Sequence, residues 1–423
     1  MGLFVNDGPF GARYVRGRQA FAIADLAEAT ASSGDRPRMP RRIYLFSLLL
    51  VLVGLWGCLL EPNSHESSQS FSLVSSSLYL IRGDSAKIEA DLDAEEAEVP
   101  GLSYSWSANF GSVVGGGPTI TYVAADTAGS AVIRVSVQRL GTPYGHGSLR
   151  IPVYRQIILL KADDFVYSPY TSSGFTPGWQ MYLDYLEEQG LKSAVGVIGA
   201  RVKDGTDGFF EQAGLLHERG TVEYFNHGYG HELNVTDEQG HTYCEFRGTP
   251  VEYQQTRLQA TQALWFEKTG IVLRGFAAPG NAFDGATRQA IASADDIVYW
   301  LFGWPIVGKI LLEYHPCKME EECAQPRYEV FTRTYVPEQR MIVYQLHPWF
   351  WTRTEMAEFI RCVNALRAAG ATFMLPLEYC RLLGWTERNL PPALAEVGPR
   401  IRRHPARQEL GHEGGNQGTL TIR

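Results

Sequence analysis

The sequence predicts an α/β protein with a parallel sheet or barrel, preceded by an all-β sandwich. Residues 71–153 contain short segments of alternating polarity that are broken by glycine, proline and aspartate. From residue 156 onward, continuous apolar runs alternate with segments of helical periodicity, which implies a parallel sheet or barrel. The chain has 423 residues, which is too long for one ordinary core and suits two domains plus terminal segments.

The composition is that of a globular protein. Apolar residues make up 45% and charged residues 20% of the chain, and the net charge is −8. Nucleic-acid-binding proteins usually carry a basic face, and no basic stripe with interleaved aromatic residues occurs in this sequence. We therefore expect no nucleic-acid partner.

The first part of the chain predicts export. Residues 39–58 combine two arginines, Arg41 and Arg42, with an apolar run and a final cysteine, which is the layout of a secretory signal. The ending "LWGC" resembles the lipobox of bacterial lipoproteins, which would make Cys58 the lipidated first residue of the mature protein. A signal that begins at Met39 makes residues 1–38 a non-native, disordered extension. The alternative is a plain membrane anchor helix, and both readings place the remaining chain outside the cytoplasm, as a membrane-anchored protein of a bacterial cell envelope.

Residues 59–70 are polar and serine-rich, as in a linker, and residues 71–154 predict a sandwich of about seven strands. Trp106 in "SYSWSA" is the expected core tryptophan of this domain. The pattern resembles the immunoglobulin-like modules of bacterial surface proteins, although the segment contains no cysteine and no catalytic cluster. We interpret it as a spacer or a glycan-contacting module.

The second domain, residues 155–385, alternates strands with helices in a regular order. Strands are expected in "QIILLKA", "SAVGVIG", "TVEYF", "RGFAAPG", "DIVYWLFG", "RMIVYQLH" and "ATFMLPL". Helices are expected in "PGWQMYLDYLEEQ", which ends at Gly190, in "FFEQAGLLHER", in the long segment that opens at Pro250, and in "TEMAEFIRCVNALRAAG". Residues 386–423 are rich in proline, arginine and glycine and predict a disordered tail.

Polar residues follow several of these strands, at the end where the loops of a parallel fold converge. The first strand leads to Asp163 and Asp164, the third to His227 and His231, the "RGFAAPG" strand to Pro279, Gly280 and Asn281, and the "RMIVYQLH" strand to His347. Each feature alone is more often structural, because a single histidine commonly forms hydrogen bonds and an aspartate pair commonly caps a turn. Their joint position at the strand ends favours a functional site.

The order Asp-Asp, His-x-x-x-His, Pro-Gly and Leu-His resembles that of the polysaccharide deacetylase family, also called the NodB-homology or carbohydrate esterase family, over residues 156–385. The resemblance implies a distorted (β/α) barrel. It also implies metal-dependent hydrolysis of N- or O-acetyl groups on sugars, with carbon–nitrogen bonds other than peptide bonds as the amide targets.

The resemblance also assigns roles to residues. Asp164, His227 and His231 would bind a divalent ion, with Zn²⁺ the first choice for one carboxylate and two imidazoles. Asp163 would be the general base, and His347 would protonate the leaving amine. A backbone N–H of the Pro279–Gly280–Asn281 turn would bind the oxyanion. Trp349 and Trp351 would stack on a sugar ring, with core packing as the alternative.

The chain departs from the family pattern at several positions. Lys161 and Ala162 precede the aspartate pair, and Ala277 stands where the family commonly has an arginine that orients the catalytic aspartate. Lys161 and Arg274 are the candidates to replace that arginine. An insertion at residues 232–249, which contains Cys244, is expected to form a lid or a substrate wall.

Two cysteine pairs are conceivable outside the cytoplasm: Cys317 with Cys323, which are close in sequence, and Cys362 with Cys380.

Three functions are therefore carried forward. The first is removal of acetyl groups from an acetylated polysaccharide of the cell envelope or its surroundings. The second is a catalytically weak or inactive relative that binds a surface glycan, which the missing arginine motivates. The third is metal-dependent hydrolysis of another bond, such as a glycosidic one.

Overall fold

A computed structural model describes residues 69–92, 99–321 and 324–386. The predicted signal at residues 39–58, with Cys58, the non-native extension before it, nearly all of the linker and nearly all of the tail lie outside these ranges. In the part of the chain that is described, no helix has both the length and the apolar character needed to cross a bilayer.

Residues 69–92 and 99–154 form two packed sheets, as the alternating pattern predicts. One sheet joins β1 (Gln69–Ser70), β9 (Thr142–Tyr154), β8 (Gly129–Arg139) and β5 (Leu102–Ala108), with β3 (Leu80–Ile81) on β9. The other joins β2 (Ser72–Ser75), β4 (Ser85–Asp91), β7 (Thr119–Val123) and β6 (Ser112–Val114). Alternate residues of β4 are buried, because successive side chains of a strand point to opposite faces. Trp106 packs at the edge of the shared core, and its indole N–H donates to the carbonyl of Gly117 (2.9 Å).

The second region is a parallel (β/α) barrel that does not close, which confirms the predicted fold class. Its strands lie in the order β17 (Ile310–Leu312), β16 (Tyr299–Leu301), β15 (Gly275–Phe276), β12 (Val222–Asn226), β11 (Ser193–Val197), β10 (Gln156–Phe165) and β20 (Met341–Leu346), and β21 (Ala371–Phe373) also pairs with β10. Every residue of β10 is buried, as expected for a strand covered on both faces. No pairing joins β17 to β20 among the described residues, so the barrel has an open seam.

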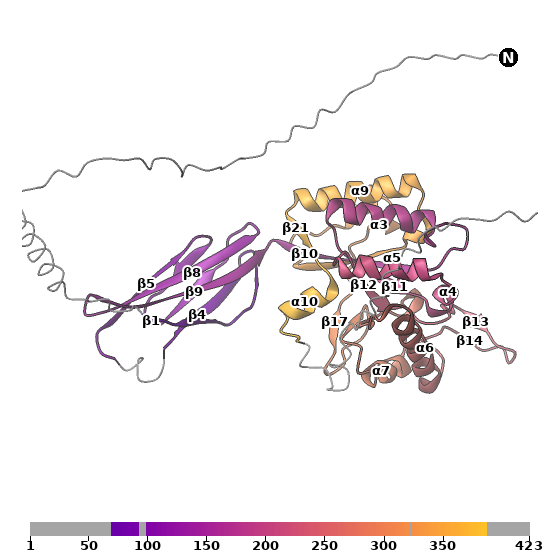
Figure 1. The fold of residues 1–423 in the computed structure, drawn as a ribbon, viewed down its shortest axis with the longest axis horizontal. Helices are drawn as coiled ribbons and strands as arrows, with labels where there is room; N and C mark the ends of the chain where they lie inside the picture. The colour runs from indigo at the N-terminus through magenta and orange to yellow at the C-terminus, as the bar shows by residue number, and fades with distance from the viewer. Residues whose placement is uncertain (1–68, 93–98, 322–323, 387–423) are drawn as a thin grey trace, which may run out of the picture. The chain divides into compact units, whose positions relative to one another are not determined.

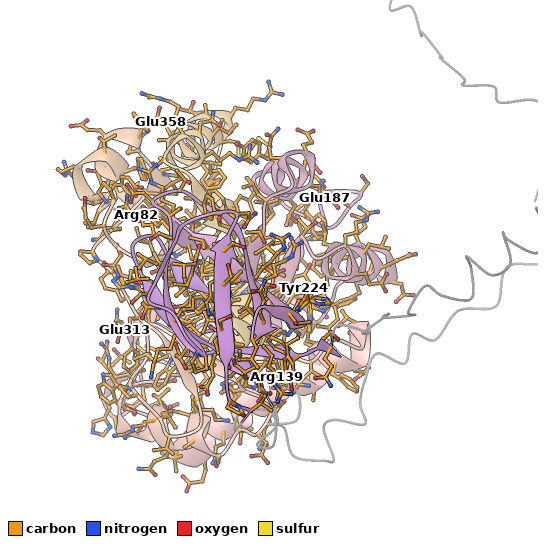
Figure 2. The ribbon with its side chains drawn as sticks, turned by 90° about the vertical axis from the view of Figure 1, so that its left-hand side faces the viewer. Arg82, Arg139, Glu187, Tyr224, Glu313 and Glu358 are labelled. Carbon is orange, nitrogen blue, oxygen red and sulfur yellow. The ribbon has the colours of Figure 1, made fainter. Side chains whose placement is uncertain are left out.

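Helices cover the outside of the barrel (Figure 1). They are α3 (Pro177–Gln189), α4 (Gly199–Val202), α5 (Asp207–Glu218), α6 (Val251–Thr269), α7 (Gly285–Ala292), α8 (Tyr328–Thr334), α9 (Arg353–Ala368) and α10 (Pro376–Leu382), with short 3-10 turns η1 (Pro279–Asn281) and η2 (Pro348–Phe350). Figure 2 labels Glu187 of α3 and Glu358 of α9, which lie on the outside of this layer, and Tyr224 of β12, which is buried beneath it.

The helix boundaries follow the sequence signals closely. The side chain of Thr176 caps α3 by accepting from the N–H of Trp179, and Gly190 ends the helix in the left-handed conformation (φ 60°). The long helix α6 begins one residue later than expected, because Pro250 is its N-cap rather than its first helical residue. The predicted strand "ATFMLPL" is shorter than expected, since Pro376 begins α10, which the sequence analysis did not identify.

The expected pairing of Cys362 with Cys380 is wrong. Both thiols are free and buried in different hydrophobic clusters, Cys362 under the outer helices and Cys380 in the barrel interior. Cys317 is also a free thiol in the structure, and its suggested partner Cys323 lies outside the described residues.

Candidate active site

The side chains singled out from the sequence meet at one end of the barrel. Asp163 and Asp164 lie at the end of β10, the His227–His231 loop follows β12, and His347 follows β20. The strands are parallel, so their carboxyl ends share one rim of the barrel. Residues separated by nearly two hundred positions in the sequence are thereby brought together.

Asp164, His227 and His231 form a compact group of donor atoms. The Oδ1 atom of Asp164 lies 2.9 Å from Nε2 of His231 and 3.5 Å from Nε2 of His227. One donor atom from each of the three residues lies within 4.8 Å of the others. This is the size of a site in which three protein ligands share one divalent ion and leave positions open.

The hydrogen bonds around His227 indicate that a cation suits this group. Its Nδ1 atom lies 2.8 Å from the carbonyl oxygen of Ala277, which only accepts, so Nδ1 carries the hydrogen. When the ring is neutral, the lone pair of Nε2 faces the Asp164 carboxylate. Two acceptors that face each other in a buried site repel unless a cation lies between them, and a carbonyl on the far nitrogen is the usual support of a metal-bound imidazole. The three residues therefore fit a divalent ion.

A left-handed backbone conformation orients two of these three side chains. Asp164 (φ 63°) and His231 (φ 55°) adopt the left-handed conformation, which is uncommon for residues other than glycine. Burial raises the pKa of Asp164, but the two neighbouring imidazoles lower it more, so that the pKa of its carboxyl lies below its usual value. Burial lowers the pKa of His231, yet the carboxylate of Asp164 raises it above the ordinary value. The site favours positive charge between the carboxylate and the rings.

Asp163 lies beside this group and has other partners. Its Oδ2 atom forms a buried ion pair with the ammonium of Lys161 and accepts from the side-chain amide of Gln345 (2.8 Å). The same oxygen lies 3.8 Å from Nε2 of His347 and 4.0 Å from Nε2 of His227. Burial raises the pKa of Asp163, but Lys161 and the two histidines lower it below its usual value. Asp163 is therefore held as a carboxylate.

Lys161 supplies a positive charge beside Asp163. The side chain of Ala277 is uncharged. Lys161 lies on the same strand as Asp163, two residues before it, and its fully buried ammonium contacts the carboxylate of Asp163. The rings of Phe302 and Phe225 lie 5.0 and 5.8 Å from this ammonium, within the range of cation–π contacts. This outcome agrees with one of the two candidates named from the sequence.

His347 is oriented by a residue that the sequence analysis missed. Its Nδ1 atom lies 2.6 Å from Oε2 of Glu320, and its backbone N–H donates to Oε1 of Glu320 (2.8 Å). Burial lowers the pKa of His347, but the carboxylate of Glu320 raises it above the ordinary value. Glu320 belongs to an acidic run, "MEEEC", that resembles a solvated surface, so the sequence alone carries no signal for this contact.

The expected stacking of Trp351 on a sugar ring is wrong. Its side chain is 3% exposed, packs in the core against Tyr182 and Phe359, and donates its indole N–H to Glu320 (3.0 Å). It therefore cannot offer a face to a sugar ring, and the core alternative applies. Trp349 is 43% exposed, so its predicted contact with a sugar stays a prediction.

The Pro279–Gly280–Asn281 turn is η1, and it is linked to the aspartate through Gln345. The side-chain amide of Asn281 donates to Oε1 of Gln345 (2.9 Å). Proline has no N–H, and the backbone N–H of Asn281 donates to the carbonyl of Ala278 (2.9 Å). Gly280 (φ 57°) is thus the residue of this turn that remains to donate to an oxyanion.

A pocket of about 460 Å³ opens beside these residues, on the side of His347. Its lining combines polar and apolar side chains, including Asn281, Phe302, Tyr314, Cys317, Gln345 and His347. Its volume falls within the range of ordinary small-molecule sites.

Comparisons with known proteins give the following. No protein-family profile and no curated protein sequence matches the chain. Among solved structures, it is similar to a CE4 family pseudoenzyme from Bacillus anthracis (15% identity, 53% of this chain and 64% of that chain, TM-score 0.37). It is also similar to a family 4 acetyl xylan esterase from Clostridium thermocellum in complex with a cobalt ion (16% identity, 59% of this chain and 97% of that chain, TM-score 0.39). A third similar structure is peptidoglycan deacetylase PdaC from Bacillus subtilis (12% identity, 54% of this chain and 92% of that chain, TM-score 0.37).

These likenesses carry no argument about family or activity at such identities and TM-scores. The match also spans less than two thirds of the Bacillus anthracis chain. The case for a function rests on the geometry of the residues themselves.

Proposed function

We propose that this protein is a metal-dependent hydrolase that removes acetyl groups, N- or O-linked, from a polysaccharide of the cell envelope or its surroundings. The observation that carries the proposal is the group of Asp164, His227 and His231, with Asp163 and His347 beside it. The resemblance of the Asp-Asp, His-x-x-x-His, Pro-Gly and Leu-His pattern to the polysaccharide deacetylases supports the choice of acetyl groups on sugars.

Each side chain has a chemical part in this proposal. A divalent ion held by Asp164, His227 and His231, Zn²⁺ by preference, supplies Lewis-acid polarisation of the acetyl carbonyl and of water. Asp163 takes a proton from the attacking water, and Lys161 and Gln345 hold its carboxylate in place. His347 gives a proton to the leaving nitrogen or oxygen, while Glu320 fixes the ring through Nδ1 and leaves Nε2 toward the site.

The pocket beside His347 is the proposed binding place for the sugar. Trp349, which lies two residues after His347 and is partly exposed, is the proposed stacking surface for a sugar ring. The second candidate, an inactive glycan-binding protein, was motivated by the missing arginine. The buried cation that Lys161 supplies to Asp163 favours the first candidate, and the second stays an alternative.

Metal analysis and acetate release test the proposal together. The purified protein is expected to contain or take up one equivalent of Zn²⁺ and to release acetate from N-acetylated chitooligosaccharides or acetylated xylan. Chelation should abolish the release, and added Zn²⁺ should restore it. Shortened sugars without acetate would identify a glycosidic hydrolase instead. A protein that binds no metal and releases nothing from any of these substrates would refute the proposal.

A further inference from the structure

We propose that Glu245 is a positioning residue that sets the affinity of the metal centre by holding the backbone of the His227–His231 loop. The inference rests on the proposed function in one respect, because it takes His227 and His231 to be metal ligands. Glu245 lies in the insertion at residues 232–249, for which the sequence suggested a lid or a substrate wall.

The carboxylate of Glu245 accepts from three successive backbone N–H groups. Oε1 accepts from Tyr229 (2.6 Å) and Gly230 (3.0 Å), and Oε2 accepts from Gly230 (3.1 Å) and His231 (2.6 Å). The side chain of Glu245 is fully buried. Hydrogen bonds from backbone N–H groups to an ionised carboxylate are about twice as strong as neutral ones, and consecutive N–H groups that point inward form a known type of anion site.

The loop is built around this carboxylate. Gly228 has φ 77°, and a Cβ atom at this position would lie 2.7 Å from Oε2 of Glu245 and 2.9 Å from Cγ of Pro279. Gly228 is therefore needed for close approach as well as for backbone conformation. The carbonyl of Gly228 in turn accepts from the hydroxyl of Thr261 on α6 (2.9 Å), so the loop is fixed on both sides.

The insertion has the means to hold Glu245 in place. It forms a small hairpin of β13 (Val235–Thr236) and β14 (Thr242–Tyr243), and Glu245 follows the second strand. The backbone N–H of Glu245 donates to the carbonyl of Glu232 (2.8 Å), and its own carbonyl accepts from the hydroxyl of Thr249 (3.0 Å). Glu245 is thus anchored at both backbone groups within the insertion. This segment therefore acts as a brace for the ligand loop.

The consequence concerns metal affinity. His231 has a left-handed backbone, which costs free energy, and the bond from its N–H to Glu245 stabilises that conformation before any ion arrives. If the carboxylate is removed, the ion itself has to order the loop, and part of its binding free energy is lost. Removal of groups that orient metal ligands weakens metal binding by about 10–100-fold.

The test is a metal titration of the full chain. Metal-free parent protein, Glu245→Gln and Glu232→Gln are titrated with Zn²⁺ in competition with a chromophoric chelator. Glu245→Gln should raise the dissociation constant by about 10–100-fold. Glu232→Gln is the matched control: it removes the same charge from the same insertion, but this carboxylate pairs with Arg257 (2.9 Å) and accepts from the hydroxyl of Tyr253 rather than from an N–H of the loop. Its affinity should stay close to that of the parent.

Hydrogen exchange provides a second measurement that needs no variant. In the metal-free parent, the amides of Tyr229, Gly230 and His231 should exchange slowly, because they donate to a buried carboxylate. Fast exchange of all three, or an unchanged dissociation constant in Glu245→Gln, would overturn the inference. A parent that fails to bind Zn²⁺ but protects these amides would instead count against the proposed function.

Discussion

Asp163 and Asp164 are neighbours in the chain, yet their carboxylates have different partners. Asp164 adopts a left-handed backbone conformation, which turns its side chain toward the two histidines, while Asp163 stays in contact with Lys161 and Gln345. The sequence pattern assigned separate roles to the two aspartates. It could name Lys161 only as one of two candidates, because the partner of a buried charge depends on packing that spacing alone does not determine.

Substitution of each aspartate by asparagine should separate the two roles. Asp163→Asn is expected to lower kcat for acetate release by about 10²–10⁴-fold, the usual contribution of a general base, while the metal content stays at the parent level. Asp164→Asn is expected to lose metal as well as activity, because it removes an anionic ligand. Steady-state kinetics and metal analysis of both variants check this. Loss of metal from Asp163→Asn would mean that the assignment of ligand and base is wrong.

The buried pair of Lys161 and Asp163 makes a prediction about stability. Lys161→Met leaves the carboxylate of Asp163 buried without its cation, which should lower the free energy of unfolding by about 3–5 kcal/mol. The double variant Lys161→Met/Asp163→Asn contains no uncompensated charge and should recover a large part of that loss. Urea denaturation of the parent, both single variants and the double variant measures the coupling. Additive effects of the two substitutions would contradict it.

At the scale of single elements, the loop after β12 and the insertion that follows act as one unit. Gly228 and Gly230 lie between the two histidines, where glycine lets the loop bend so that both rings face one ion. The left-handed Gly228 agrees with that, and the close approach of Glu245 adds a second reason. That contact could not be predicted, because a carboxylate seventeen residues after Gly228 has no recognisable spacing. The short strand β17 and the helix α10 were also not predicted, because three and seven residues carry too little periodicity.

The junction of β12 and α10 predicts a pH effect on stability. Glu223 is buried in β12, and its Oε2 atom accepts from the backbone N–H of Leu377 in the first turn of α10 (2.9 Å). Burial raises the pKa of Glu223 to about 7, although the N–H of Leu377 opposes the shift. A folded-state pKa above the unfolded value of about 4.3 means that folding favours the protonated carboxyl. This stabilisation is fully present below about pH 4.3 and is lost as the pH rises through about 7.

The variant Glu223→Gln isolates this contribution, because the amide keeps an acceptor for Leu377 and does not titrate. Between pH 5 and pH 8 the parent should lose about 2–3 kcal/mol of unfolding free energy more than Glu223→Gln does. Urea denaturation at both pH values measures the difference. Parallel losses in the two proteins would show that Glu223 does not titrate between its folded and unfolded values in this range.

At the scale of the whole molecule, the order of a sandwich followed by a barrel follows from the change of sequence pattern near residue 155. The pattern could not tell how far the barrel closes. Closure depends on whether β17 and β20 pair, and a strand of three residues such as β17 has little periodicity to read. The seam matters for function, because the pocket beside His347 is lined by Val343 and Gln345 of β20 on one side and by Phe302 and Tyr314 on the other.

The expected attachment of the protein to a membrane can be tested at Cys58. If "LWGC" is processed as a lipobox, the sulfur of Cys58 carries the lipid, and stable membrane attachment depends on that single atom. The parent protein, expressed in a bacterial host with labelled palmitate, should then carry the label, and Cys58→Ser should lose all of it. A control substitution, Cys244→Ser, should keep the label, because that thiol is buried in the folded protein. A parent protein that stays in the membrane fraction without label would identify residues 39–58 as an anchor helix, since an apolar segment holds to the bilayer without the thiol.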